Sequence, residues 1–154
     1  MSPSPERKPQ KPVSLAGYLE ALSRPIFSTG MSWRVVQAKW DGIRDAFDGF
    51  DPEKVAAMTP ADVDRLTEDR RVIRNRKKIE AIIGDAKRMI ELDHEHGGFR
   101  HYLESRGSTH EAVAALRREF RFLGETGAYI FLWSVGEPVP SHEQWAAAHG
   151  KHAA

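Results

Sequence analysis

Residues 59–92 read TPADVDRLTEDRRVIRNRKKIEAIIGDAKRMIEL, and the rest of the chain is organised around this stretch. It predicts a short helix, a tight basic turn at about residues 69–74, and a long helix that leads away from the turn. Thr59 is a good N-cap, with Pro60 at the first helical position and Asp62 at the third, where an acid favours a helix start. Asn75 can open the long helix. Its apolar residues recur at close to 3.6 positions, which predicts one buried face: Ile79, Ile82, Ile83, Ala86 and Ile90.

The turn and the start of the long helix are strongly basic. Residues 69–88 contain eight basic and three acidic side chains, whereas the whole chain of 154 residues has a net charge of only +1. Two interpretations remain open. The charge run is either an ordinary solvated surface or an anion site, because free amides at a helix N-terminus ringed by Arg and Lys suit a phosphate.

Composition limits the class of protein. The length suits one domain with a real core. The absence of cysteine excludes disulfides, cysteine-held iron–sulfur clusters and thiolate zinc sites. No apolar run reaches the length of a membrane span. Residues 1–12 are rich in proline and charge and lack the apolar core of a signal peptide, so we expect a disordered tail and a cytoplasmic protein.

Helix signals continue on both sides of the organising stretch. Pro25 is expected to end the first helix, because the residue before a proline is disfavoured in the helical region, and residues 26–32 are expected to be a loop. No stretch alternates long enough to predict a strand. The chain is therefore predicted to be all-α, a compact domain of six to eight helices over residues 13–142, with a frayed tail over 143–154. The other helices are expected at 15–23, 33–47 (capped by Ser32), 52–58, about 99–103, after Ser108, and from Thr126 to about 135.

Several motifs carry a resemblance to a known family. They are FSTGMSW (27–33), FDPEKVAAM (50–58), DVDRL (62–66), VIRNRKKIEAII (72–83) and FRFLGET (120–126). Together they resemble the DNA-3-methyladenine glycosylase I family over about residues 15–142. The resemblance implies a helix-hairpin-helix fold and a base-excision repair enzyme that flips an alkylated adenine out of the duplex and hydrolyses its N-glycosidic bond. It also implies double-stranded, alkylation-damaged DNA as partner. No lysine occupies an evident nucleophile position, so we expect no strand cleavage. We expect a monomer, with no cofactor and no membrane.

The same resemblance implies a set of site residues. Trp33 matches the pocket tryptophan, with Ser32 and Phe27 beside it as base-binding residues; the alternative for Trp33 is an ordinary core aromatic. Gly30 and Met31 lie on the preceding loop and are candidates for the wedge that fills the gap left by a flipped base, unless Met31 only packs in the core. The basic hairpin takes the place of the DNA-backbone anchor, which implies phosphate contacts from Arg71, Arg74, Arg76, Lys77 and Lys78.

The sequence also departs from the family pattern. Pro25 stands where members usually carry a glutamate that faces the base, and the proline-rich stretch stands where they carry a Cys- and Trp-containing segment. His142 is near a late zinc-ligand position of the family, but without cysteine we expect no metal there and a surface side chain. Glu20 and Tyr18 are candidates for the missing catalytic polarity, although Glu20 also suits a structural role.

Three hypotheses follow from these observations. The first is a monofunctional glycosylase that uses water as nucleophile. The second is a catalytically impaired module that binds DNA or damage on the same fold. The third is a different chemistry on another nucleobase or nucleotide.

Overall fold

The computed structural model describes residues 9–148, and in this range it contains only helices and their connections. They are α1 (Leu15–Ser28), α2 (Trp33–Ala46), the short 3-10 helix η1 (Asp48–Phe50), α3 (Pro52–Ala56), α4 (Pro60–Glu68), α5 (Arg76–Glu95), α6 (Phe99–Glu104), α7 (Thr109–Glu119), α8 (Glu125–Ser134) and α9 (His142–Ala148). The all-α prediction is confirmed. Within the described range, no helix is both long and apolar enough to cross a membrane.

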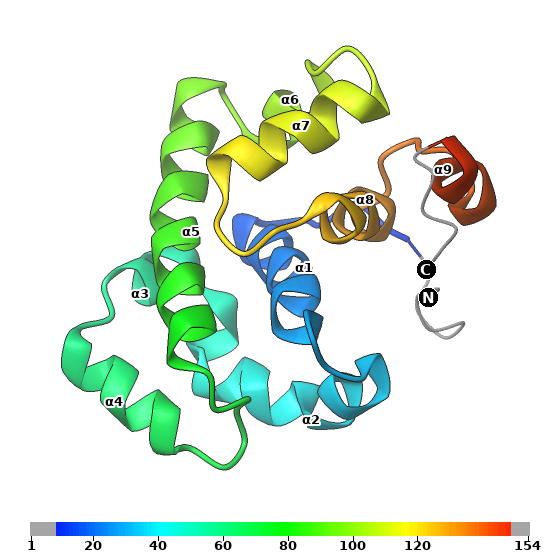
Figure 1. Ribbon diagram of the computed structural model, residues 1–154. Helices are drawn as coiled ribbons and strands as arrows, with labels where there is room; N and C mark the ends of the chain where they lie inside the picture. The colour runs from blue at the N-terminus through cyan, green and yellow to red at the C-terminus, as the bar shows by residue number, and fades with distance from the viewer. Residues whose placement is uncertain (1–8, 149–154) are drawn as a thin grey trace.

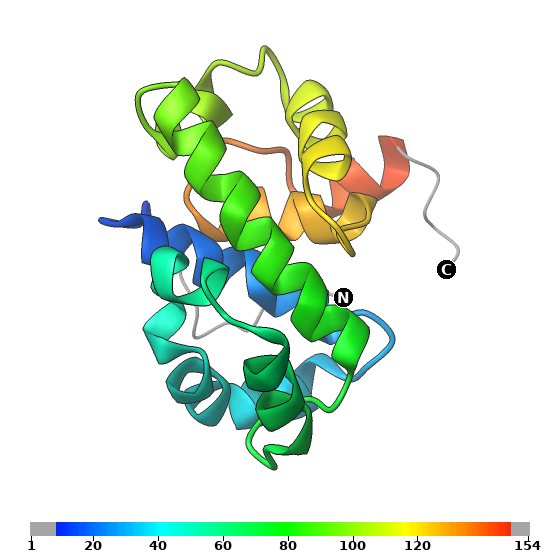
Figure 2. The same ribbon diagram turned by 90° about the vertical axis from the view of Figure 1, so that its left-hand side faces the viewer.

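The long helix α5 crosses the whole molecule. Figures 1 and 2 show α2 and α4 at one end of it, α6 and α7 at the other, and α3 against its side. Between these two ends, α1 packs against both α5 and α8. The stretch that the sequence singled out therefore provides the element to which both halves of the fold attach.

Aromatic side chains fill the core at both ends of α5. One cluster joins α1, α2 and η1, and its members are Phe27, Trp40, Phe47 and Phe50. The other joins α1 to the second half of the chain, and its members are Tyr18, Phe99, Tyr102, Phe120 and Phe131. The first cluster joins neighbouring elements, whereas the second joins α1 to residues 99–131, so α1 contributes to both clusters and connects the two halves of the core.

The hairpin between α4 and α5 follows the sequence signals. Thr59 and Asp62 form a reciprocal capping box, in which each side chain accepts a hydrogen bond from the other residue's backbone amide. The side chain of Asn75 accepts the amide of Lys78 and caps α5. The connection covers residues 69–75, as the charge and cap pattern predicted.

Pro25 does not end the first helix, so this prediction is wrong. α1 continues to Ser28 with Pro25 inside it. Ile26 and Phe27, which follow the proline, are completely buried, and their burial outweighs the cost of a proline inside a helix. Thr29 then closes the helix by donating both its amide (3.1 Å) and its hydroxyl (3.0 Å) to the Pro25 carbonyl.

The structure describes part of each expected tail, residues 9–12 at the N-terminal end and residues 143–148 at the C-terminal end. Residues 143–148 were expected to fray but form most of α9, where Trp145 stacks on Tyr129 with ring centroids 5.2 Å apart. At the other end, Lys11 forms ion pairs with Glu104 and Glu137. The rest of both expected tails, residues 1–8 and 149–154, lies outside the described residues.

Candidate functional site

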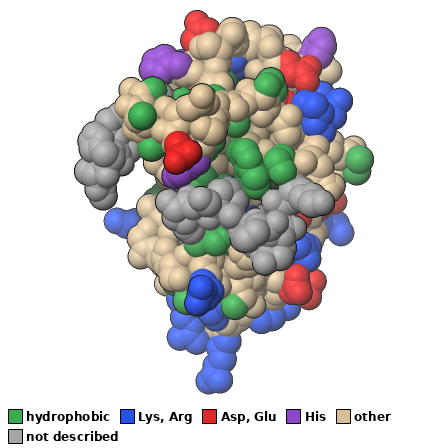
Figure 3. Space-filling view, turned by 90° about the vertical axis from the view of Figure 1, so that its right-hand side faces the viewer, with side chains coloured by type: hydrophobic (Ala, Val, Ile, Leu, Met, Phe, Trp, Pro, Cys, Tyr) green, Lys and Arg blue, Asp and Glu red, His purple; other side chains and the backbone are tan. Residues whose placement is uncertain are grey.

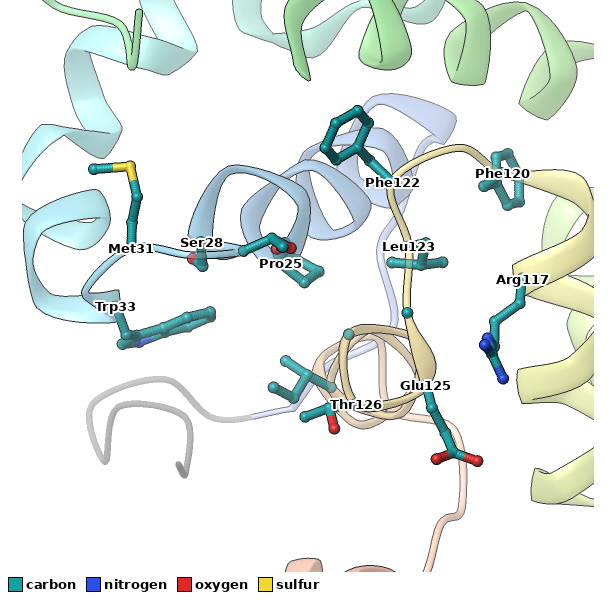
Figure 4. A pocket seen from close by; sticks show the side chains of 14 residues that line it. Pro25, Ser28, Met31, Trp33, Arg117, Phe120, Phe122, Leu123, Glu125 and Thr126 are labelled. Atoms are coloured by element: carbon teal, nitrogen blue, oxygen red, sulfur yellow. The ribbon is translucent and has the colours of Figure 1, made fainter. Parts of the chain in front are cut away.

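A cavity of about 880 Å³ opens between the end of α1 and the connection from α7 to α8. Figure 4 shows the side chains that surround it. One wall comes from α1, the following loop and the start of α2, and the other from residues 117–130. The lining residues are Pro25, Ser28, Thr29, Met31, Trp33, Arg117, Phe120, Phe122, Leu123, Gly124, Glu125, Thr126, Gly127 and Ile130.

Trp33 is positioned at the cavity by the cap of α2. Ser32 occupies the N-cap position, and its hydroxyl accepts the amide of Val35 at 3.4 Å, so Trp33 is the first helical residue. Its ring is half-buried on the cavity wall. The indole Nε1–H is buried and has no acceptor among the described residues. Because an indole nitrogen can only donate, this group is satisfied only if a ligand or water supplies an acceptor.

Met31 lies at the mouth of the cavity. Gly30, just before it, has φ +75°, a left-handed conformation that glycine adopts without steric cost. This turn leaves the Met31 side chain 39% exposed while it still lines the cavity. The structure thus brings both wedge candidates and the pocket tryptophan to one place.

The opposite wall contains a residue that sequence reasoning missed. Phe122 is 42% exposed and has φ +60°, which is uncommon for a residue with a side chain. Its neighbours Phe120 and Leu123 are buried. The motif FRFLGET was noticed for its resemblance, but nothing in the sequence alone shows that its second phenylalanine is exposed while Phe120 and Leu123 are buried.

Two charged side chains line the cavity, and neither was predicted. Arg117 comes from α7, and Glu125 is the first residue of α8, one position before the expected cap Thr126. In Figure 4 the Glu125 carboxylate points away from Pro25. The cavity wall near Pro25 therefore presents a proline ring rather than an acid.

Lys78 is placed differently from the other cations of the hairpin. Its side chain is only 4% exposed, and its ammonium donates to the carbonyls of Phe27 (3.0 Å) and Thr29 (2.5 Å). Burial lowers the pKa of this lysine. The ammonium also sits at the C-terminal end of α1, where a cation is favourable. Lys78 therefore holds the loop of Met31 and is removed from the set of phosphate-binding residues.

Four other predicted site residues do not line the cavity. Phe27 is completely buried in the aromatic core, and Ser32 serves as the exposed cap of α2. Tyr18 is buried with its ring edge against Phe99. Glu20 accepts hydrogen bonds from the Trp40 indole (2.7 Å) and from Arg44 Nε (2.9 Å), which joins α1 to α2. These contacts correspond to structural roles.

The hairpin cations divide into paired and unpaired groups. Arg71 makes a two-nitrogen ion pair with Asp69, and Arg76 pairs with Asp64 and, at 3.6 Å, with Glu80. The exposed side chains of Arg74 and Lys77 have no ion pair within residues 9–148. Figure 3 shows Lys and Arg side chains gathered at the end of the molecule where α2 and the hairpin lie. The unpaired cations are the ones free to meet a phosphate.

His142 is half-buried, although a surface side chain was expected. It begins α9, and its ring lies 6.0 Å from that of Tyr129. Over the part of the chain that the structure describes, no three histidine or acidic side chains gather as a metal site would require.

Comparison with known proteins identifies the family. The profile of the methyladenine glycosylase family matches residues 15–116. The DNA-3-methyladenine glycosylase 1 of Escherichia coli (strain K12) is 34% identical over 128 residues, covering 70% of this chain and 68% of that protein. The DNA-3-methyladenine glycosylase of Haemophilus influenzae is 33% identical over 128 residues, with coverages of 70% and 69%. The chain belongs to the methyladenine glycosylase family.

A solved structure in this family supports the fold as well. The 3-methyladenine DNA glycosylase I from Staphylococcus aureus matches with a TM-score of 0.73 and 26% identity, over 84% of this chain and 80% of that one. The family profile covers Trp33, the wedge loop and the hairpin, but it ends at residue 116. The second wall of the cavity, from Arg117 onward, lies beyond this match.

Proposed function

We propose that this protein is a DNA glycosylase that hydrolyses the N-glycosidic bond of an alkylated adenine, 3-methyladenine, after the base has been flipped into the cavity beside Trp33. The observation that carries the proposal is the half-buried Trp33 ring on the cavity wall, with its buried Nε1–H lacking an acceptor in the described structure. The names of the relatives from E. coli and H. influenzae support the same activity.

Base flipping is required by the geometry of duplex DNA. A glycosidic bond inside the stack cannot be reached by a protein side chain or an oriented water, so the nucleotide must rotate out at a cost of a few kcal/mol. The cavity volume lies within the range of about 300–1,000 Å³ that is usual for ligand pockets, so it readily admits one purine. The wedge loop at its mouth places Met31 where it can fill the gap.

Stacking on Trp33 suits the chemistry of the substrate. An adenine alkylated at N3 is cationic, and an indole face attracts a cation by its quadrupole as well as by dispersion. The base leaves as a neutral molecule, so its bond to the sugar is already weak and water can act as the nucleophile. The enzyme consequently needs less help with the leaving group than it would for a normal purine.

The site lacks an evident acid or base at the position where the family resemblance places a glutamate. Pro25 on the cavity wall has no acid, base or hydrogen-bond donor in its side chain. Glu20 and Tyr18 lie away from the cavity, so its geometry does not support their assignment as catalytic residues. Loss of one acid–base group typically costs about 100- to 10,000-fold in rate. We therefore expect slow turnover that relies on stacking and positioning.

The proposed DNA anchor is the hairpin. Arg74 and Lys77 are exposed beside the N-terminus of α5, where the helix dipole also favours an anion. Arg71 and Arg76 are second in importance because each must leave a carboxylate partner before it can bind a phosphate. Such contacts do not depend on sequence and position the duplex over the cavity.

A damage-binding module without turnover is the second candidate function. The specific observation in its favour is Pro25 on the cavity wall, since a proline ring preserves the shape of a base pocket but supplies no proton transfer. Both functions use the same hairpin, wedge loop and tryptophan.

The test is release of free 3-methyladenine from alkylated duplex DNA by the intact protein. We expect wild-type protein to release it, and Trp33→Ala to lose about 10- to 100-fold, the size of a lost base–aromatic stack. Binding of undamaged duplex should stay nearly unchanged. Val35→Ala is the matched control, because Val35 is an exposed residue on the same helix that does not line the cavity.

Two outcomes would contradict the assignment. A sharp fall in the melting temperature of Trp33→Ala would identify Trp33 as a core residue, since truncating a buried tryptophan costs about 3–5 kcal/mol. Absence of base release by wild-type protein, with tighter binding to alkylated than to undamaged duplex, would favour the binding module.

A further inference from the structure

Two apolar side chains project at the mouth of the cavity, one from each wall. Met31 is 39% exposed and Phe122 is 42% exposed, and both line the cavity. Figure 4 shows them on either side of Ser28 and Pro25. Large exposed apolar residues are few in the described chain, so two of them at one opening point to a contact with another molecule.

The backbone of Phe122 is held in a conformation that a phenylalanine disfavours. A left-handed φ of +60° is adopted freely by glycine but is strained for an aromatic residue, and such strain concentrates at functional sites. Glycine would relieve the strain, and a polar residue would relieve the exposure. The sequence has neither, so the aromatic ring itself is the feature that needs an explanation.

A buried carboxylate fixes the loop of Phe122. Asp85 on α5 is 1% exposed, and its Oδ1 accepts the backbone amide of Arg121 at 2.8 Å. Phe120 and Leu123 enter the core on either side. With both flanks buried and the preceding amide held, the ring of Phe122 is directed outward.

The same helix fixes the loop of Met31. Lys78 precedes Asp85 by seven residues, which is about two turns, so the two buried charges lie on one side of α5, roughly 10 Å apart along its axis. Lys78 binds the carbonyls of Phe27 and Thr29 just before the Met31 turn. One rigid helix thus sets the positions of both projecting loops.

A cation adjoins Phe122 in the sequence, as a nucleic-acid contact would require. Arg121 immediately precedes Phe122, whereas Arg117 lines the cavity with its guanidinium beyond Leu123, away from the Phe122 ring (Figure 4). Both side chains are exposed, and neither forms an ion pair within the described residues. An apolar ring next to an exposed cation in the chain matches a base stack with its phosphate backbone, whereas an apolar protein groove would not need the cation.

We propose that Phe122 is a second DNA-inserting residue, which enters the duplex opposite Met31 and stacks on a base exposed when the damaged nucleotide leaves the helix. Asp85 is its positioning residue. The proposal rests on the proposed function, because it takes duplex DNA with one base flipped out as the ligand. It extends that function by assigning a DNA contact to the second wall of the cavity, which lies after residue 116, where the family profile ends.

The experiment compares two duplexes of the same sequence, one intact and one with a tetrahydrofuran abasic-site analogue that leaves a gap in the stack. Affinity is measured by fluorescence anisotropy for full-length wild-type protein and for Phe122→Gly, Phe122→Leu and Val35→Ala. Glycine suits the φ of position 122, so Phe122→Gly should remain folded, which its melting temperature checks.

We expect Phe122→Gly to reduce the preference for the gapped duplex by about tenfold, the size of one base–aromatic contact, with affinity for the intact duplex unchanged. Phe122→Leu should keep part of the preference, and Val35→Ala all of it. Asp85→Ala should lose preference although the ring is present, because its loop is released.

Two results would overturn the proposal. One is an unchanged preference in Phe122→Gly. The other is an equal loss of affinity for intact and gapped duplex, which would make Phe122 part of the general binding surface. Neither result depends on base release, so a wild-type protein that binds gapped DNA through Phe122 but releases no 3-methyladenine would contradict only the glycosylase activity.

Discussion

The hairpin and the mouth of the cavity are built by contacts of very different range. The hairpin is held by pairs close in sequence, such as Thr59 with Asp62 and Asn75 with Lys78. The mouth joins residues 25–33 to residues 117–130, and two buried charges on α5 hold its loops. The proposed DNA anchor can thus be specified locally, whereas the proposed base pocket depends on the whole fold and includes buried polar groups whose desolvation costs free energy.

The largest expected effect concerns the buried carboxylate behind the mouth. Burial raises the pKa of Asp85 to about 7, which the Arg121 amide and charge only partly offset. In the unfolded chain an aspartate has a pKa of about 3.9. Between these values the native state keeps a proton that the unfolded state has released. The free energy of unfolding should therefore fall as pH rises from about 4 to 7, by on the order of 4 kcal/mol, and then level off.

Asp85→Asn should remove most of this pH dependence, because the amide oxygen can still accept from Arg121 but has no proton to lose. Urea unfolding at pH 4.5 and pH 8 measures the difference. Asp64→Asn is the control, since Asp64 is an exposed partner of Arg76 on the hairpin. If the wild type were equally stable at both pH values, burial of the ionised Asp85 carboxylate would not lower the free energy of unfolding.

The next effect tests the chemistry of the mouth. Pro25 lines the cavity at the position where the family resemblance places a glutamate. Pro25→Glu should raise the rate of 3-methyladenine release by about 100-fold, the lower end of what one acid–base group contributes. Pro25→Gln has a similar size without the charge, so equal gains in both variants would show that removing proline from the helix, rather than adding a carboxylate, had the effect.

The difference between local contacts in the hairpin and long-range contacts at the cavity mouth explains what the sequence could predict. The caps at Thr59 and Asn75, the apolar face of α5 and the all-α class follow from patterns within a few residues. The signal at Pro25 was equally local but was overridden by the burial of Ile26 and Phe27, which only the assembled core supplies.

The candidate site divides in the same way. Trp33 and Met31 were found because they belong to one short motif on one wall. Phe122 and Glu125 line the other wall, which folding brings from far along the chain, so no spacing rule joined them to Trp33. Lys78 was assigned to DNA because charge in a sequence does not reveal burial.

A smaller effect is expected where the hairpin meets the mouth. Lys78→Met removes the donor that serves the Phe27 and Thr29 carbonyls, and leaving such acceptors unpaired costs about 1–3 kcal/mol. Thermal unfolding should show the loss. Lys77→Met is the matched control, because Lys77 is the exposed neighbour and its replacement should stay within about 0.5 kcal/mol. Equal melting temperatures for the two variants would contradict the structural role of Lys78.

The smallest effect separates the cations of the hairpin itself. Arg74 and Lys77 are exposed without an ion pair in the described structure, whereas Arg71 and Arg76 are paired with carboxylates. A free cation gains a phosphate contact at no cost in broken pairs, so the double variant Arg74→Ala, Lys77→Ala should weaken binding of every duplex sequence alike. The slope of log affinity against log salt concentration should fall by about 2, one for each lost phosphate contact. In the double variant Arg71→Ala, Arg76→Ala the slope should change less, because those guanidinium groups already have partners and their removal also frees Asp69 and Asp64 near the DNA.

Salt titrations of both double variants on one undamaged duplex measure the two slopes. Equal slopes in the two variants would mean that net charge, and not the pairing in the folded hairpin, determines which cations bind the backbone.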